Sequence, residues 1–202
     1  MKYLNKIIAA LLILVVLYVG YSFIQLRREL FKVYDVPEQY AFGSADADLV
    51  IVDFNKYGCE HCHSLHPILL EAMKRDGKVR YIPRTITHGL IWEETVSAAV
   101  YAAAEQGKFF EMHNMVYAKW PIANRKTLFK YAENIGLDTN KLKNDMVAPE
   151  IMERVRENQK FFDAWDLRKT PSLLMGKKAI YSPGKNTPTV EEMLEKFAKA
   201  RN

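Results

Sequence analysis

Residues 49–63 read LVIVDFNKYGCEHCH, and they are the most informative stretch of this 202-residue sequence. The apolar run at 49–54 predicts a strand that is buried on both faces. A short break at Tyr57-Gly58 separates this strand from the only two cysteines in the chain, Cys59 and Cys62, and helical spacing follows them. A cysteine pair that opens a helix after a buried strand is typical of a thiol–disulfide redox site.

The predicted helix gives the two cysteines different roles. Unpaired backbone N–H groups and the positive end of the macrodipole favour a negative charge at a helix N-terminus. We therefore expect Cys59 to be an exposed thiolate with a low pKa, and Cys62, one turn further on, to be the buried resolving thiol. A protonated His61 would favour the Cys59 thiolate, whereas Glu60 would oppose it by adding a negative charge.

Three other interpretations of these residues stay open. Cys59-x-x-Cys62-His63 satisfies the attachment motif of a c-type haem. A zinc site would need four ligands, with His63 or His66 beside the cysteines, but the sequence has no second cysteine pair. A disulfide that only staples the chain would close too short a loop to constrain the unfolded chain much. The redox interpretation needs no metal and no cofactor.

Asp53 interrupts the apolar run of the first strand. A carboxylate in a buried strand is costly unless it has a partner or a task. Because Asp53 lies six residues before Cys59, it is a candidate for taking the proton of Cys62 during exchange. The alternative is that Asp53 caps a turn or faces solvent.

The segment from Ile7 to Ile24 is almost entirely apolar and contains no charged residue. Its 18 residues just span the hydrocarbon core of a membrane. A cleaved signal peptide, with Gly20 and Ser22 before the cut, is the alternative. Both interpretations carry the rest of the chain out of the cytoplasm. The predicted parts are a cytoplasmic N-terminus at 1–6, a transmembrane anchor at 7–26, a tether at 27–45 and one domain at 46–202.

Composition excludes some classes of partner. The chain carries 29 basic and 24 acidic residues, and four of the basic ones precede the first acid, Glu29. The predicted domain is therefore close to neutral, which gives no indication of nucleic-acid binding. A single C-x-x-C with no other cysteine fits a redox catalyst outside the cytoplasm, because no structural disulfide is present to be scrambled.

Apolar spacing and turn residues predict the remaining elements. Pro67 lies inside the first helix and should kink it. His113, on a predicted helix, is expected to be a core residue rather than a ligand. The predicted order is a strand at 49–54, a helix at 63–73, a strand at 79–83, helices at 93–106, 109–119, 126–135, 140–147 and 150–165, strands at 172–175 and 179–181 around a hairpin turn at 176–178, and a helix at 189–200.

This order and four motifs resemble the thioredoxin superfamily and, within it, the DsbA family of thiol–disulfide oxidoreductases. The motifs are Val52-Asp53-Phe54 before Cys59-x-x-Cys62, Pro67, residues 103–113 (AAEQGKFFEMH) and Thr170-Pro171-Ser172. The resemblance implies an α/β thioredoxin-like fold with a helical insertion at about 90–166. It also implies a cis Pro171 opposite the cysteines and a proton-transfer role for Asp53. Two departures, Glu60 in place of proline and Lys169 in place of glycine, affect the expected oxidising strength.

The resemblance implies an extracytoplasmic enzyme that introduces disulfides into exported proteins. We expect a monomer, held in the cytoplasmic membrane by one span with its domain on the periplasmic side, and re-oxidised by a DsbB-like membrane quinone reductase. The loop at Thr170 and Pro171 would bind an extended substrate. Alternatives are a reductant or an isomerase of the same fold, a membrane-anchored c-type cytochrome, and a non-catalytic peptide-binding module. Few residues separate the anchor from the first strand, too few for the dimerisation domain of an isomerase.

Overall fold

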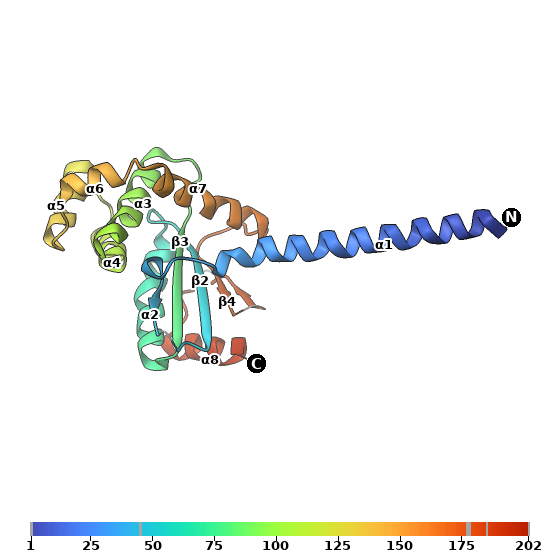
Figure 1. Ribbon diagram of the computed structural model, residues 1–202. Helices are drawn as coiled ribbons and strands as arrows, with labels where there is room; N and C mark the ends of the chain where they lie inside the picture. Colours follow the sequence, from blue (N-terminus) through green and yellow to red (C-terminus); the bar gives the residue numbers. More distant parts are fainter. Residues whose placement is uncertain (1, 45, 177–178, 185, 202) are drawn as a thin grey trace. The chain divides into compact units, whose positions relative to one another are not determined.

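The computed structural model describes residues 2–44, 46–176, 179–184 and 186–201. The chain divides into two units, Met1–Asp35 and Val36–Asn202. In the described part of the second unit, five strands form one sheet in the order β1-β3-β2-β4-β5 (Figure 1). The strands are β1 (Phe42–Gly43), β2 (Leu49–Asn55), β3 (Val79–Thr85), β4 (Ser172–Met175) and β5 (Ala179–Tyr181).

The central position of β2 accounts for its apolar run. β2 pairs in parallel with β3 and antiparallel with β4, so a strand lies along each of its edges. All of its residues except Val50 are buried, so both of its faces are covered. A strand in that position must be apolar throughout rather than alternating. The predicted strand at 49–54 is therefore confirmed, with one more residue at its end.

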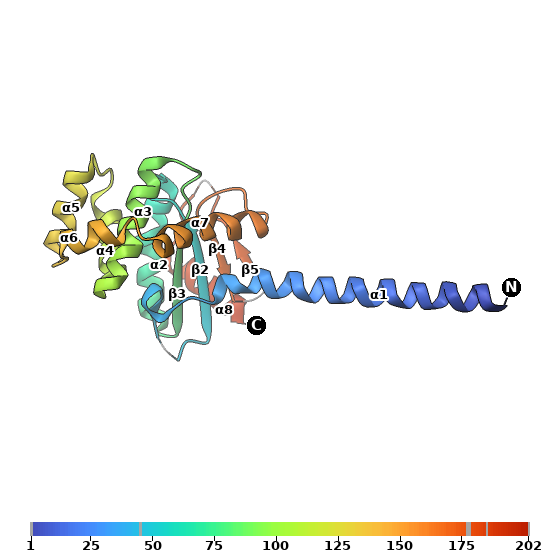
Figure 2. The same cartoon turned by 45° about the horizontal axis from the view of Figure 1, so that its top comes forward.

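Five helices and a short 3-10 helix lie between β3 and β4, and they gather at one end of the sheet (Figure 1). Their bounds agree with the predicted helices to within three residues. They are α3 (Ile91–Ala103), η3 (Ala104–Gln106), α4 (Phe109–Lys119), α5 (Arg125–Asn134), α6 (Thr139–Asp145) and α7 (Pro149–Ala164). Helix α7 also covers one face of the sheet (Figure 2), where Phe162 packs edge-on against Phe54 of β2.

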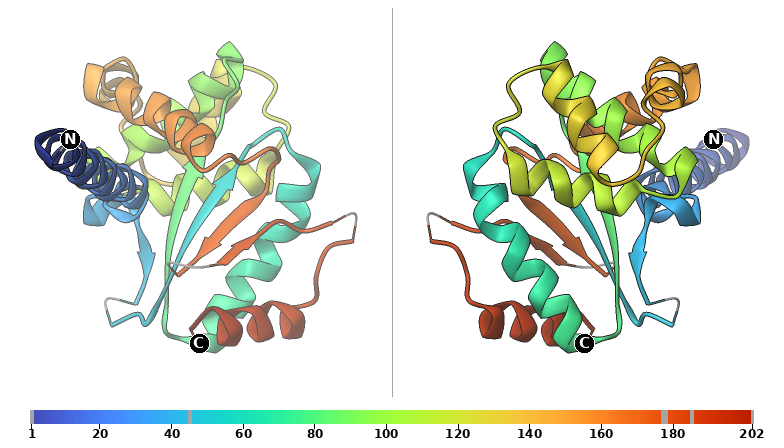
Figure 3. Two further views of the ribbon diagram at one scale, coloured as in Figure 1. Left: turned by 90° about the vertical axis from the view of Figure 1, so that its right-hand side faces the viewer. Right: turned by 90° about the vertical axis from the view of Figure 1, so that its left-hand side faces the viewer.

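Helices α2 (Glu60–Asp76) and α8 (Val190–Arg201) lie side by side on the other face (Figure 3). Leu65, Leu69 and Phe197 are buried there against the apolar side chains of β2 and β3. Pro67 lies inside α2, as predicted, and the helix runs on past it to Gly77, which ends it in the left-handed conformation at φ 74°. This packing holds the first turn of α2 at the end of β2.

The sheet begins earlier in the chain than the strand predicted at 49–54. Phe42 and Gly43 pair with Tyr81 and Arg80 of β3, and the Phe42 ring stacks on that of Phe110. The compact unit therefore starts at Val36, with the 3-10 helix η2 (Glu38–Tyr40) before β1. A two-residue strand has no periodicity that could indicate it. The predicted hairpin turn at 176–178 includes two residues that lie outside the described part of the chain.

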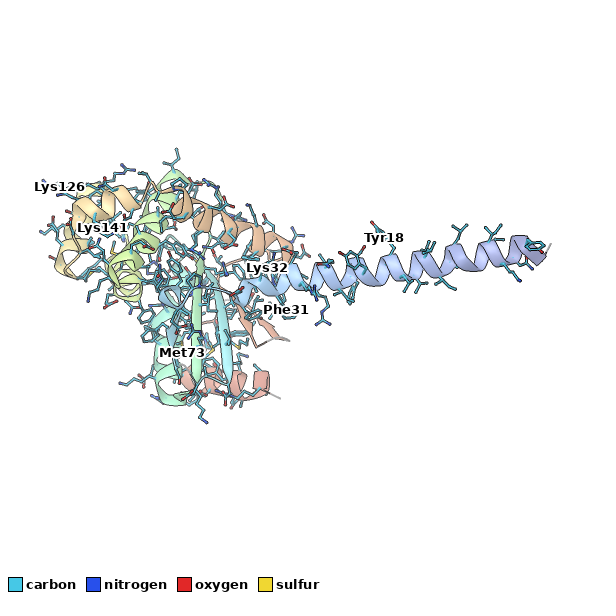
Figure 4. The ribbon with its side chains drawn as sticks, viewed as in Figure 1. Tyr18, Phe31, Lys32, Met73, Lys126 and Lys141 are labelled. Atoms are coloured by element: carbon cyan, nitrogen blue, oxygen red, sulfur yellow. The ribbon has the colours of Figure 1, made fainter. Side chains whose placement is uncertain are left out.

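The first unit consists of α1 (Lys2–Phe31) and the 3-10 helix η1 (Lys32–Tyr34). The large apolar side chains that the structure describes at 7–26 of α1 are exposed, and Tyr18, which Figure 4 labels, is 72% exposed. Among the described residues, this is the one helix that is long and apolar enough to cross a membrane. It is consistent with a membrane anchor, and it continues past the predicted end at residue 26.

Candidate active site

Cys59 is the N-cap residue of α2. Its backbone is extended, and its sulfur accepts a hydrogen bond from the backbone N–H of Cys62 at 3.2 Å. The N–H groups of a first helical turn have no partner within the helix, so the sulfur of the capping residue satisfies one of them. Both cysteines are free thiols in this structure. The predicted placement of the pair at the start of a helix is therefore what the chain adopts.

The two thiols have opposite acidities. The pKa of Cys59 is lowered to about 6, chiefly by a hydrogen bond from the Cys62 thiol, and also by a side-chain hydrogen bond with Thr170, the Cys62 N–H and the charge of His61. Cys62 is only 2% exposed, and burial, followed by the interactions with Cys59, raises its pKa far above the usual range. At neutral pH, Cys59 is therefore mainly a thiolate while Cys62 keeps its proton.

The loop before β4 lies against Cys59. The Thr170–Pro171 peptide bond is cis, and the Cys59 sulfur is 3.5 Å from the Thr170 carbonyl oxygen, to which it donates only when it is protonated. The antiparallel pairing of β4 with β2, in which Ser172 is opposite Phe54, brings this loop to the end of β2 from which α2 starts. Chain segments that are distant in sequence thereby meet at the reactive sulfur.

Asp53 is buried on β2 and is 4% exposed, so it neither faces solvent nor caps a turn. One carboxylate oxygen accepts hydrogen bonds from the Tyr81 hydroxyl at 2.7 Å and the Asn55 amide at 3.2 Å. Burial raises the pKa of Asp53 to about 7, although both of these hydrogen bonds oppose the increase. Its charge in turn raises the pKa of Cys62. The two groups therefore interact, and the proton-transfer role of Asp53 stays a prediction.

Of the three histidines near the pair, His61 is exposed, and His63 and His66 are hydrogen-bonded to other residues. Glu60 and His61 are exposed, whereas the His63 ring Nε2 is 2.6 Å from the Tyr57 carbonyl oxygen and donates to it. His66 is buried and bonds to Asn114 at 2.8 Å. Among the described residues, no three or more His, Cys, Asp or Glu side chains are grouped as metal ligands.

His113 is a core residue, as predicted. It is fully buried, and its Nδ1 is hydrogen-bonded to the Tyr57 hydroxyl at 2.9 Å. Its Nε2 is 3.4 Å from the hydroxyl of Tyr81, the same hydroxyl that donates to Asp53. Burial lowers the pKa of His113 well below its usual range, so its ring is neutral within this buried network.

Glu93 and Trp120 both lie against the residue before Cys59, and neither was predicted from the sequence. Glu93, in the first turn of α3, accepts the Gly58 N–H at 3.0 Å, and Trp120 packs on the same glycine. A signal for Glu93 was present, because it precedes Val96 and Val100 by three and seven positions on the apolar stripe of its helix. An acid on such a stripe is unusual enough to be noted.

Comparison with known proteins identifies the family. A family model described as thioredoxin matches residues 35–198. The chain belongs to the thioredoxin family. A solved thioredoxin-like oxidoreductase from Silicibacter pomeroyi superposes with a TM-score of 0.75 and 24% identity, over 84% of this chain and 96% of that structure. The ScsC catalytic domain of Proteus mirabilis gives a TM-score of 0.72 with 17% identity, over 88% and 97%.

A thiol–disulfide exchange protein from Wolbachia pipientis, alpha-DsbA2, gives a TM-score of 0.71 with 16% identity, over 87% of this chain and 97% of that structure. These likenesses confirm the predicted fold, a thioredoxin-like α/β fold of the DsbA type with inserted helices. The predicted insertion at about 90–166 corresponds in this chain to the helices α3–α7, which separate β3 from β4.

Curated relatives of this thioredoxin-family chain carry a different name. The Na(+)/H(+) antiporter NhaA 3 of Salinispora tropica is 24% identical over 171 residues, which are 83% of this chain and 26% of the antiporter. NhaA 1 of a Mycobacterium species is 28% identical over 156 residues, 74% of this chain and 25% of the antiporter. The chain spans about a quarter of the length of the curated relatives it matches.

Proposed function

We propose that this chain is a membrane-tethered thiol–disulfide oxidoreductase that introduces disulfides into exported proteins through Cys59 and Cys62. The observation that carries the proposal is the contrast between the two thiols of the pair. The pKa of Cys59 is lowered to about 6, while that of the buried Cys62 is raised. A thiolate that is stable at neutral pH is a good leaving group, and a pair that contains one is more easily reduced.

The reaction starts from the Cys59–Cys62 disulfide. A substrate thiolate attacks the Cys59 sulfur, so that a mixed disulfide forms and Cys62 leaves as a thiolate. A second substrate thiolate then attacks the substrate sulfur of the mixed disulfide and releases the Cys59 thiolate. The substrate has lost two electrons and gained a disulfide, and the enzyme has gained the two electrons as a dithiol. The low pKa of Cys59 favours this second release.

Asp53 supplies the proton that Cys62 requires when it leaves. Its pKa of about 7 means that it carries a proton in a substantial fraction of molecules at neutral pH. It is buried near the pair and interacts electrostatically with both thiols. On re-oxidation the transfer runs in reverse, and the Asp53 carboxylate takes the proton from Cys62.

The segment around Thr170 and Pro171 binds the substrate chain. Thr170 is half-buried, and its carbonyl oxygen lies 3.5 Å from the reactive sulfur. Backbone groups in this position can pair with an extended peptide as an added strand. Such pairing would present a substrate cysteine to Cys59 without requiring a particular side chain beside it.

The proposal includes the predicted arrangement in the cell. Helix α1 anchors the chain by a single span at 7–26, residues 1–6 stay in the cytoplasm, and a monomeric catalytic domain works on the periplasmic side. A DsbB-like membrane quinone reductase re-oxidises the pair. The long apolar helix supports the anchor.

The test is the reduction potential of the Cys59–Cys62 pair in the detergent-solubilised full chain, measured in glutathione buffers. A value near that of DsbA, about −120 mV, is expected for an oxidant. A value near that of thioredoxin, about −270 mV, would instead support the reductant, which the acidic Glu60 favours. Oxidation of a reduced dithiol peptide should be lost in Cys59→Ser. If that variant oxidised the peptide as fast as the wild type, Cys59 would not carry the reaction and the proposal would fail. If the wild-type chain bound the peptide without oxidising it, the chain would be a binding module.

A further inference from the structure

Glu93 is a second buried acid next to the active-site pair. It lies in the first turn of α3 and is 5% exposed. One carboxylate oxygen accepts the backbone N–H of Gly58, the residue that precedes Cys59, at 3.0 Å. The other oxygen is buried and has no hydrogen-bond partner among the described residues. A buried carboxylate with one unpaired oxygen lowers the stability of the folded protein. The thiol chemistry described above does not explain why Glu93 is there.

Any side chain at position 58 would require Glu93, Trp120 or the turn itself to move. A Cβ atom there would lie 2.3 Å from the Glu93 carboxylate oxygen and 3.3 Å from the Trp120 ring. Gly58 has no left-handed conformation that would by itself require a glycine. Side-chain packing, rather than backbone conformation, therefore explains this glycine. The turn that carries Cys59 is clamped between α3 and Trp120.

The charges around Glu93 come from the turn and from α2. Lys56 and His63 favour its ionised form, whereas the Cys59 thiolate disfavours it. Burial is the largest influence and raises the pKa of Glu93. The Gly58 N–H lowers that pKa, as does Lys56. Because two like charges disfavour each other reciprocally, an ionised Glu93 also disfavours the thiolate of Cys59.

We propose that Glu93 is a positioning residue of the active site, which holds the Gly58 turn and, when ionised, limits how strongly the Cys59 thiolate is stabilised. This inference rests on the proposed redox function. The helix N-terminus and the hydrogen bonds to Cys59 make the pair an oxidant. The charge of Glu93 makes that oxidant weaker than it would be without Glu93. Glu93 thereby acts against the charge of His61, which lowers the pKa of Cys59.

The experiment titrates the Cys59 thiolate by its ultraviolet absorbance in the full chain and in Glu93→Gln. Glutamine keeps an oxygen for the Gly58 N–H and removes the charge. The midpoint should fall by about 0.5 to 1 pH unit, by the Coulomb interaction expected near a protein surface. The reduction potential should rise by about 15 to 30 mV, which is that three- to tenfold change in the equilibrium converted at 29.6 mV per tenfold. Glu94→Gln, one position further on the same helix, should change neither value.

An unchanged or raised midpoint in a folded Glu93→Gln protein would overturn the inference. If Glu93→Gln does not fold, the reciprocal measurement serves. The carboxyl carbon of Glu93 is titrated by NMR in the wild-type chain and in Cys59→Ala, and removal of the thiolate should lower the midpoint of Glu93. An identical midpoint in the two proteins would also refute the inference. If only the inference fails, the protein still oxidises dithiols, but the titration midpoint of Cys59 is the same in Glu93→Gln as in the wild type. If only the proposed function fails, Glu93→Gln lowers that midpoint, but the protein does not oxidise dithiols.

Discussion

The Cys59 sulfur lies 3.5 Å from the carbonyl oxygen of Thr170, although the two residues are 111 positions apart in the chain. β4 returns antiparallel to β2 after the whole helical insertion, and this pairing brings the two residues together. Cys59 therefore has the end of a helix on one side and the loop before a strand on the other. The first orients N–H groups towards the sulfur, and the second leaves a backbone carbonyl next to it.

Replacing Cys62 should affect the acidity of Cys59 more than replacing His61. The hydrogen bond from the Cys62 thiol is the largest cause of the low pKa of Cys59, and the charge of His61 is the smallest of those named. In Cys62→Ala the pKa of Cys59 should rise from about 6 towards about 8.5, the value of a free thiol. His61→Ala should produce a smaller increase. The rate of alkylation against pH measures both, and a larger effect of His61→Ala would contradict this order.

Asp53→Asn should change how stability depends on pH. Burial raises the folded-state pKa of Asp53 from 3.8 to about 7, so the folded protein holds a proton that the unfolded chain has released. The cost of ionising Asp53 is absent below pH 4 and increases as the pH rises from about 4 to 7. Asp53→Asn should therefore unfold at higher urea than the wild type at pH 8, by up to about 4 kcal/mol in unfolding free energy.

Near pH 4 the two proteins should differ little in unfolding free energy. Asp163→Asn, at an exposed position of α7, is the control and should follow the wild type at both pH values. If Asp53→Asn showed the same difference from the wild type at pH 4 and at pH 8, its carboxyl group would not titrate in this range in the folded state.

Gly58→Ala should destabilise the turn before Cys59. The new methyl group would meet the Glu93 carboxylate at 2.3 Å and the Trp120 ring at 3.3 Å, so one of these groups or the backbone must move. Overpacking of this kind costs about 1 to 3 kcal/mol. Gly184→Ala is a matched control, because a Cβ atom there meets no atom within 4 Å and that glycine also has no positive φ. Urea unfolding compares the two variants, and equal midpoints would exclude the clamp on Gly58.

Leu14→Arg should weaken the association of the full chain with membranes. Leu14 lies in α1 and its side chain is exposed on that helix. A charge at the centre of a spanning helix costs about 2.5 to 3.5 kcal/mol on insertion. Carbonate extraction of membranes should therefore release more of this variant than of Leu14→Ala, which keeps the segment uncharged.

Sequencing the N-terminus of the membrane-bound protein distinguishes an anchor from a cleaved signal peptide, because only the anchor retains residues 1–26.

Local pattern was sufficient to predict the helices and most strands, because their signals lie within a few residues of each other. Such local signals are the apolar run at 49–54, the cysteine pair after it and the helical spacing of the insertion. β1 was not predicted, since Phe42 and Gly43 are a strand only through pairing with β3. The start of the compact unit at Val36 was missed for the same reason.

The sequence by itself determined that two cysteines open a helix behind a buried strand, and that a long apolar segment precedes them. Tertiary structure alone decided the surroundings of those cysteines. Tyr81 donates to Asp53 from a neighbouring strand, and Glu93 reaches Gly58 from a helix 35 positions further along the chain. Periodicity along a chain shows which face of an element is buried, but the pKa of a buried group depends on which distant side chains surround it.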